Sequence, residues 1–260
     1  MGFTSVVGGP LLLSFDSGQR WVKGRRFDMP EIPPPLSKPV QPSLSAEDVC
    51  ITYKVGGVEV PVLRGVSLSV AAGEKIFLCG PSGAGKTTLL YTLGGLERPN
   101  VGRIFVGGDS LYQMSQSARA TLRNRRMGYI FQNYLLLPEL TALENVTLPA
   151  LIGGTSARER AEHLLASVGL IHRLHHLPTQ MSGGEQQRVA IARSLINDPG
   201  FIFADEPTGN LDSKTSHEVM ALLLAAVAES GKTLMVVTHD TSLASLGDRT
   251  LHLRDGLMES

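Results

Sequence analysis

The chain has 260 residues, 42% of them hydrophobic and 18% charged, and its 24 basic and 24 acidic side chains give a formal net charge of zero. This composition is that of an ordinary globular protein with ample apolar material for a buried core. Because a nucleic-acid-binding domain usually shows a basic excess, the balanced charge argues against nucleic acid as a partner.

The sequence carries no signal for a membrane span or for a covalent or metal framework. Its longest apolar run, Val219 to Ala228, has about half of the roughly 20 residues that a spanning helix needs. Met1 to Leu13 has no basic segment before its apolar patch, so it does not resemble a signal peptide. The only cysteines, Cys50 and Cys79, predict neither disulfide nor zinc site and fit a reducing cytosolic setting.

Residues 1–45 differ in composition from the rest of the chain. They hold a basic cluster and several closely spaced prolines: Lys23, Arg25, Arg26, Pro30, Pro33, Pro34, Pro35, Pro39 and Pro42. Because prolines fix φ and remove backbone donors, we expect an extended or disordered N-terminal extension. A dispensable tail, or a chain that starts at Met29, is favoured over a docking arm. The folded domain is predicted to cover residues 46–260.

From residue 46 onward, short apolar segments alternate with helical ones. The predicted strands are Lys75–Cys79, Gly128–Phe131, Phe201–Ala204, Thr233–Val237 and Thr250–Leu253, and the predicted helices are Lys86–Leu93, Ala157–Val168, Glu185–Ile196 and Ser213–Ala228. The alternation predicts an α/β fold with a mainly parallel sheet. Continuous apolar runs such as Phe201–Ala204 are typical of strands buried on both faces. Between about 133 and 198 only helices are expected, which predicts an inserted helical subdomain.

A phosphate-binding loop follows the first predicted strand. The pattern G-x-x-x-x-G-K-[ST] is matched in full by Gly80, Pro81, Ser82, Gly83, Ala84, Gly85, Lys86 and Thr87. Its glycines let successive backbone N–H groups point at phosphate oxygens, and the helix that begins there favours an anion. Lys86 is expected to reach the β- and γ-phosphates, and the Thr87 hydroxyl to bind Mg²⁺.

Two carboxylates end the strand Phe201–Ala204. A phosphate-loop site needs an acid at such a strand end to hold Mg²⁺, and Asp205 fits this role. Glu206 can then polarise the attacking water as a general base. Asp-Glu alone is more often a solvated strand end, but together with the phosphate loop it predicts nucleotide hydrolysis.

A second anion-binding helix start lies at Ser182, Gly183 and Gly184. Ser182 is expected near the N-cap, with Glu185–Ile196 as the body of the helix. A helix N-terminus attracts anions. A phosphate loop and a second phosphate-binding helix end thus occur in one chain. Their co-occurrence is explained if the two features act from opposite halves of a dimer.

These motifs resemble those of ABC transporter ATPases over about residues 47–256. Further positions match the family in order: Tyr53 the aromatic that stacks on adenine, Gln132 the Q-loop residue that senses Mg²⁺ and the γ-phosphate, Asp212 the D-loop, and His239 the switch histidine. The resemblance implies a P-loop fold of ABC type with an antiparallel β subdomain. It also implies that Thr88 contributes to ATP binding and that Thr87, Gln132 and Asp205 form the Mg²⁺ site. Glu206, His239 and Gln132 would be catalytic. Two ATP molecules would be sandwiched between the two subunits of a homodimer.

Two segments are similar to one branch of this family, the branch of LolD, MacB and FtsE. These are Pro207–Asp212 and Gln132–Val146, the second being closest in wording to lipoprotein-releasing LolD. The resemblance implies a separate transmembrane permease that docks near residues 133–155. It places the chain on the cytoplasmic face of the inner membrane, where it would energise lipoprotein release or an export-like process.

Other functions were weighed against this one. A soluble ABC-type regulatory or assembly ATPase without a membrane partner would share every catalytic residue and stays open. A DNA-repair ATPase is disfavoured because no long coiled coil interrupts the sheet, and a pure binding protein is disfavoured by Glu206. The histidines at 172, 175 and 176 are expected in a solvated loop rather than in a metal site.

Overall fold

The computed structural model describes residues 21–22, 25–26 and 44–259. Most of the predicted N-terminal extension, including its prolines and Met29, lies outside these residues. The chain divides into two units, residues 1–39 and 40–260. In the first, strands β1 (Trp21–Val22) and β2 (Arg25–Arg26) form an antiparallel pair. The second unit begins its first strand at Leu44, so Leu44 and Ser45 belong to the sheet and not to the extension. The reason is burial, since Leu44 is 1% exposed.

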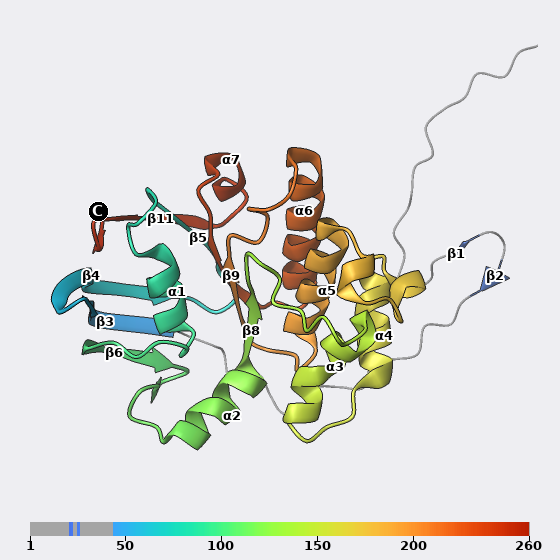
Figure 1. Ribbon diagram of the computed structural model, residues 1–260, viewed down its shortest axis with the longest axis horizontal. Helices are drawn as coiled ribbons and strands as arrows, with labels where there is room; N and C mark the ends of the chain where they lie inside the picture. The colour runs from blue at the N-terminus through green and yellow to red at the C-terminus, as the bar shows by residue number, and fades with distance from the viewer. Residues whose placement is uncertain (1–20, 23–24, 27–43, 260) are drawn as a thin grey trace, which may run out of the picture. The chain divides into compact units, whose positions relative to one another are not determined.

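Two sheets organise the second unit (Figure 1). The larger has the order β12 (Leu257–Met258), β11 (Arg249–Arg254), β5 (Lys75–Cys79), β10 (Thr233–Val237), β9 (Phe201–Asp205) and β8 (Met127–Ile130). All its pairings are parallel except β11 with β12. The smaller sheet is antiparallel, in the order β4 (Val58–Val70), β3 (Leu44–Val55), β6 (Val101–Val106) and β7 (Asp109–Ser110). The predicted α/β class with an antiparallel subdomain is confirmed.

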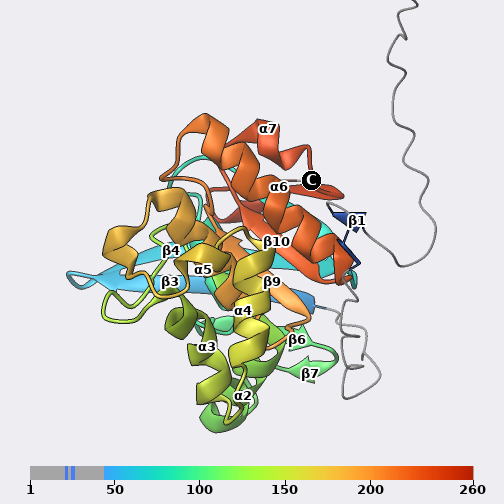
Figure 2. The ribbon, with the colours of Figure 1, turned by 90° about the vertical axis from the view of Figure 1, so that its right-hand side faces the viewer.

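The helices follow the predicted alternation, with three additions (Figure 1 and Figure 2). They are α1 (Lys86–Leu93), α2 (Gln116–Arg126), α3 (Ala142–Ile152), α4 (Arg158–Ser167), α5 (Gly183–Leu195), α6 (Ser213–Glu229) and α7 (Thr241–Ala244). Between β8 and β9 the chain forms only α3, α4, α5 and two 3₁₀ turns, Ile171–Arg173 and Pro178–Gln180. Helices α2, α3 and α7 were not predicted. In the described residues, no helix is both long and apolar enough to cross a membrane.

The parallel sheet separates two hydrophobic clusters. Along β9, Ile202 and Ala204 point into the cluster beneath the helical segment and α6, while Phe201 and Phe203 point into the cluster shared with α1 and the antiparallel sheet. This alternation is the period of two expected for a strand. Figure 1 shows α1 and β3 on one side of β9 and α5 and α6 on the other. Burial on both faces explains why β9 and β10 consist of buried residues throughout.

A side-chain network fixes the entry to α3. Thr141 caps the helix in a reciprocal capping box with Glu144. Asn145, which is fully buried, accepts a hydrogen bond from the Leu137 N–H at 2.8 Å. Its amide donates to the carbonyls of Leu137, Leu140 and Thr141 at 3.1, 2.9 and 3.1 Å. One side chain therefore satisfies the backbone of the irregular segment before the helix.

Replacing Asn145 with leucine is expected to destabilise the fold strongly. The substitution keeps the branching and the number of side-chain heavy atoms but leaves the Leu137 N–H and the Leu140 carbonyl without hydrogen-bond partners, at about 1–3 kcal/mol each for groups that water cannot reach. We expect a loss of about 3 kcal/mol in the free energy of unfolding, measured by urea denaturation. Thr147→Val is the control, because the buried Thr147 hydroxyl bonds only to carbonyls of its own helix. An equal loss in both variants would contradict the role given to Asn145.

Candidate functional site

The phosphate loop connects β5 to α1 at the carboxyl end of the parallel strands. Its glycines are required by space as well as by conformation. Gly80 has φ 150°, and a Cβ there would lie 2.0 Å from the Leu253 carbonyl oxygen. Gly85 has φ 97° and caps α1. These positions exclude larger residues, so the sequence pattern corresponds to a tight turn whose backbone leads directly into a helix N-terminus.

Lys86 lies across this loop. Its side chain is buried, and Nζ donates to the carbonyl oxygens of Gly80 at 2.8 Å and Pro81 at 2.9 Å. The ammonium group is therefore held at the centre of the loop. No carboxylate of the described residues pairs with Lys86, and a buried lysine of this kind is suited to an anionic ligand.

Thr87 and Asp205, both predicted from the sequence as Mg²⁺ ligands, are in direct contact. The Thr87 hydroxyl donates to Asp205 Oδ1 at 2.9 Å. Asp205 is 6% exposed, and its burial raises the pKa of the carboxyl above the usual range, while hydrogen bonds from Thr87 and Tyr91 act in the opposite direction. Two oxygen ligands therefore meet beside the phosphate loop.

Tyr91 was not predicted as a site residue. It lies one turn after Thr87 on α1, and its hydroxyl faces Asp205. Burial, followed by the charge of Asp205, raises the pKa of Tyr91 to about 12. The available signal was the spacing of four residues from Thr87, which places both side chains on one helix face.

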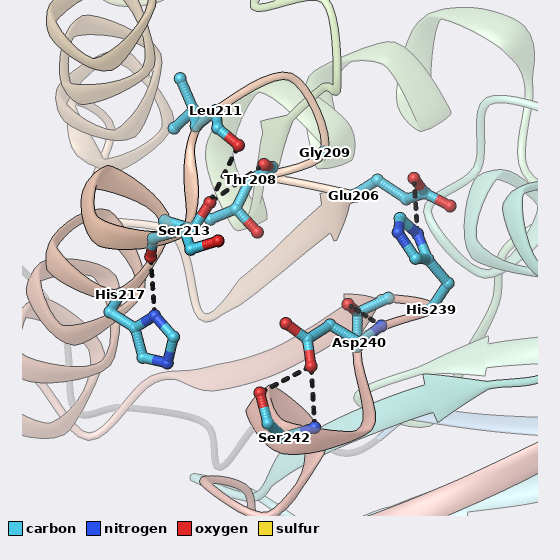
Figure 3. A pocket seen from close by; sticks show the side chains of 11 residues that line it. Glu206, Thr208, Gly209, Leu211, Ser213, His217, His239, Asp240 and Ser242 are labelled. Atoms are coloured by element: carbon cyan, nitrogen blue, oxygen red, sulfur yellow. Dashed lines mark hydrogen bonds and ion pairs between the residues drawn. The ribbon is translucent and has the colours of Figure 1, made fainter.

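Glu206 and His239 form a pair at the ends of β9 and β10 (Figure 3). His239 Nδ1 lies 3.2 Å from Glu206 Oε2. Glu206 has φ 42°, a left-handed conformation that few non-glycine residues adopt, and its N–H donates to the Val237 carbonyl at 3.0 Å. This backbone turn directs the Glu206 side chain towards His239. His239 does not cap the next helix, since Asp240 is the N-cap of α7.

Gln132 approaches Glu206 around Gly209. A Cβ on Gly209 would lie 3.0 Å from Gln132 Nε2 and 3.1 Å from Glu206 Oε2. Asn210 then donates its Nδ2 to the Gln132 carbonyl and to Asn133 Oδ1, both at 3.0 Å. The segment after β8 and the segment after β9 are thus joined, and Asn210 is a second residue that the sequence did not single out.

A cavity of about 380 Å³ opens beside the Glu206–His239 pair (Figure 3). Its other walls are the start of α6 and the loop into α7, and they include Thr208, His217 and Asp240. No phosphate-loop residue lines it. The cavity gives the Glu206–His239 pair access to solvent.

Tyr53 lies on β3, at the edge of the same site. Burial is the first cause that raises the pKa of its hydroxyl, and hydrogen bonds with Glu97 and Thr88 also act on it. Since Thr88 follows Thr87 on α1, the aromatic ring is beside the start of that helix. The antiparallel sheet therefore supplies an aromatic wall next to the phosphate loop.

The Ser182–Gly184 turn has the geometry of an open helix start. Ser182 is the N-cap of α5 and forms a capping box with Glu185, whose pKa is lowered by the hydrogen bond from the Ser182 backbone. The N–H groups of Gly183 and Gly184 make no hydrogen bond among the described residues. A Cβ on Gly183 would lie 2.8 Å from Tyr134 Oη. Glycine leaves these two donors exposed at the helix end.

Asp212 is placed as a helix cap. Its Oδ1 accepts hydrogen bonds from the N–H groups of Lys214 and Thr215 at 3.1 Å each. A hydrogen bond with the Thr215 side chain, followed by these backbone bonds, lowers the pKa of the carboxyl. The side chain is exposed and lies at the start of α6, after Leu211. As a nucleotide contact it stays a prediction.

The structure therefore brings together most of the predicted site and separates one part. The phosphate loop, Asp205, Glu206, Gln132 and His239 follow parallel strands β5, β9, β8 and β10, whose carboxyl ends share one edge. The Ser182–Gly184 turn begins α5, which Figure 1 shows apart from α1. No hydrogen bond joins that turn to the phosphate loop.

The donor set beside the phosphate loop fits Mg²⁺. A threonine hydroxyl and a buried carboxylate in contact are hard oxygen ligands, and Mg²⁺ is commonly held by one or two carboxylates together with substrate phosphates. Elsewhere in the described chain, His176 Nε2 pairs with Arg173 Nη1 at 2.9 Å. No group of three or more His, Cys, Asp or Glu side chains among the described residues is arranged as a metal site.

Comparison with known proteins identifies relatives over most of the chain. The ABC transporter family profile matches residues 63–209, more than half of the sequence. An ABC transporter ATP-binding protein of Thermotoga maritima is 52% identical over 82% of this chain and 92% of its own length. LolD, the lipoprotein-releasing system ATP-binding protein of Pseudomonas fluorescens, is 49% identical over 82% and 95%. MacB of Syntrophobacter fumaroxidans, a macrolide export ATP-binding/permease protein, is 47% identical over 83% of this chain but only 31% of its own length.

Solved structures support the same relationship. The dimeric structure of the bacterial ABC transporter cassette MJ0796 has a TM-score of 0.78 and 40% identity, over 84% of this chain and 97% of the other. A second dimeric structure of MJ0796, in a post-hydrolysis state with ADP and phosphate, matches equally well. With the strand-edge site, these relatives show that the chain belongs to the ABC transporter family, in which it is an ATP-binding and ATP-hydrolysing subunit similar to LolD and MacB.

Proposed function

We propose that two copies of this chain hydrolyse two ATP molecules at their shared interface and drive a separate membrane permease. The observation that carries the proposal is the meeting of Glu206, His239, Gln132 and Gly209 at the strand edge that also holds the phosphate loop. In this arrangement a γ-phosphate on the loop faces a carboxylate that can activate water.

The binding roles follow from position. The N–H groups of residues 80–87 cradle the phosphates, Lys86 neutralises the β- and γ-phosphates, and Tyr53 stacks on the adenine, while Thr88 lines the same helix start. Thr87, Asp205 and Gln132 would hold Mg²⁺, which when bound would screen the charge of the phosphate oxygens.

The hydrolytic step belongs to Glu206 and His239. Glu206 accepts a proton from the attacking water as the new P–O bond forms and the bond to ADP breaks. His239, held 3.2 Å from Glu206 Oε2, orients that carboxylate and donates to the γ-phosphate oxygen. Gln132 would contact both the bound Mg²⁺ and the attacking water.

The second part of each site comes from the other copy. The free N–H groups of Gly183 and Gly184 and the Ser182 hydroxyl would bind the γ-phosphate of ATP on the partner's phosphate loop. Asp212 lies on the same face, at the crossing between subunits. The dimeric MJ0796 structures support this assembly, since MJ0796 is 40% identical to this chain.

The permease is proposed to dock on residues 133–155. Exposed apolar side chains gather there, with Leu135, Leu137, Leu151 and Ile152 between 44% and 71% exposed. Such exposure marks interaction surfaces. The names of LolD and MacB suggest lipoprotein release or export as the process, at the cytoplasmic face of the inner membrane. A soluble regulatory ATPase without a membrane partner is the alternative, but that function does not explain why these apolar side chains are exposed.

Glu206→Gln is expected to abolish steady-state ATP hydrolysis, by at least a hundredfold, because the amide cannot accept the proton from water. Nucleotide binding should persist, and the variant should form a stable dimer with ATP that the wild type forms only briefly. Phosphate release and size-exclusion chromatography measure the two effects. Wild-type turnover in the variant would refute the base assignment, and a variant that stays monomeric with ATP would refute the sandwich.

Gly209→Ala is expected to lower kcat about tenfold while the KM for ATP changes little, since the added Cβ would press on Gln132 Nε2 and Glu206 Oε2 but not on the phosphate loop. Gly231→Ala serves as the control: Gly231 has φ 60° with open space around it, so the variant loses stability but keeps turnover. Equal turnover of the Gly209 variant and wild type would mean that the contact around Gly209 is irrelevant to hydrolysis.

Ile152→Glu is expected to weaken binding to inverted inner-membrane vesicles from the source cells by about tenfold, because a charge replaces an apolar contact. Its ATPase rate without membranes should equal that of wild type, since Ile152 lies at the end of α3 and is 71% exposed. Val58→Glu is the matched control, being 65% exposed on β4. The docking segment would be wrong if both variants bound vesicles equally.

A further inference from the structure

The segment after Gln132 has an unusual backbone. Tyr134 and Leu135 are consecutive non-glycine residues in the left-handed region, with φ 58° and 46°. The Leu135 N–H donates to the Asn133 carbonyl at 2.5 Å, which closes a tight three-residue turn around Tyr134. A single such residue is uncommon and two in succession are strained. Conformations of this kind persist only where the surroundings enforce them.

Arg193 supplies the enforcing contact. Its guanidinium group donates from Nη2 to the Tyr134 carbonyl at 2.7 Å and from Nη1 to the Leu135 carbonyl at 2.5 Å. It has no salt bridge with any described carboxylate. Burial without such a partner lowers the pKa of Arg193 to about 10. A charged side chain is thus kept in a half-buried place by two backbone carbonyls of the strained turn.

Arg193 also lies on the helix whose other end is offered to ATP. It is in the last turn of α5, and the N-terminus of α5 is the Ser182–Gly184 turn. Tyr134 touches both ends of this helix, since its carbonyl binds Arg193 and its hydroxyl lies beside Gly183. Two residues before Tyr134, the Gln132 side chain lies beside Gly209, which Glu206 also flanks. The strained turn that follows Gln132 therefore contacts both ends of one helix.

We propose that Arg193 is a positioning residue for hydrolysis: it clamps Tyr134 and Leu135 in their left-handed conformation, and so keeps Gln132 aligned with α5 and its Ser182–Gly184 turn. The inference rests on the proposed function and deepens it. Without the clamp, the two residues return to ordinary φ values, and the chain between β8 and Leu137 takes a different path. Gln132 then leaves Glu206, while the phosphate loop is unchanged.

The test combines Arg193→Met with relief of the strain it holds. Arg193→Met should lower kcat for ATP about tenfold and leave the KM for ATP within about twofold, because Gln132 and not the phosphate loop is displaced. Leu135→Gly, placed in the Arg193→Met protein, should raise kcat again by about threefold or more, since glycine adopts φ 46° without strain.

Leu137→Gly is the matched control for this rescue. Leu137 lies in the same segment and is 44% exposed, against 56% for Leu135, but it is not left-handed. The Leu137→Gly substitution therefore removes a similar apolar side chain and adds the same backbone freedom, but it relieves no strain at Tyr134 or Leu135. Rescue by Leu135→Gly alone supports the clamp. Equal rescue by both glycines, or by neither, overturns it.

Arg193→Lys keeps the test decisive if the methionine variant does not fold. An ammonium group lacks the planar fork that donates to two carbonyls, so Arg193→Lys should show a smaller loss of kcat and the same selective rescue. Wild-type turnover in Arg193→Lys with no response to Leu135→Gly would overturn the clamp and leave Arg193 a purely structural side chain. Glu206→Gln separates the two hypotheses, because its retained activity would refute the proposed function whatever the Arg193 variants do.

Discussion

Parallel pairing of β5, β10, β9 and β8 is the constraint on which the site depends. The pairing of Val237 with both Leu78 and Asp205 brings the phosphate loop, Asp205 and His239 to one edge of the sheet. Such pairing survives only if both faces of the sheet are covered. The helical segment with α6 covers one face, and α1 with the antiparallel sheet covers the other. The same strand register therefore places the site residues at the edge of the sheet and buries the residues at its centre.

Of the six described non-glycine residues with positive φ, three lie where the loops leave this edge. Glu206, Tyr134 and Leu135 are all left-handed without being glycine, and such residues cost about 1–3 kcal/mol each. Each is held by a specific contact: Glu206 by the Val237 carbonyl, the other two by Arg193. The strained residues direct side chains that a relaxed loop would place elsewhere. The free-energy cost of these strained residues is offset by burial in the core, where all residues of β9 and β10 are buried.

The sequence predicted the elements whose signals are local. Strand β10 and helix α1 have the predicted bounds, because continuous apolar runs and a phosphate loop are readable without partners. Helix α2 was missed since its only buried residue is Leu122, and α3 because Pro149 lies inside it. Tyr91, Asn210 and Arg193 escaped notice for another reason. Their partners are carbonyls or carboxylates of distant segments, and left-handed backbone at Tyr134 and Leu135 has no residue signature.

The segment 207–212 joins the two halves of the site within one subunit. Gly209 packs beside Glu206 and Gln132, and Leu211 lies against Gly183, where a Cβ would be 3.2 Å from Leu211 Cδ2. In the proposed dimer, a displacement of Glu206 after hydrolysis would move residues that touch the helix end offered to the partner's ATP. If the two subunits are equivalent, the same connection runs in both directions. Loss of one γ-phosphate would then weaken the neighbouring site through packed atoms, and coupling of the two sites is what the proposed assembly implies.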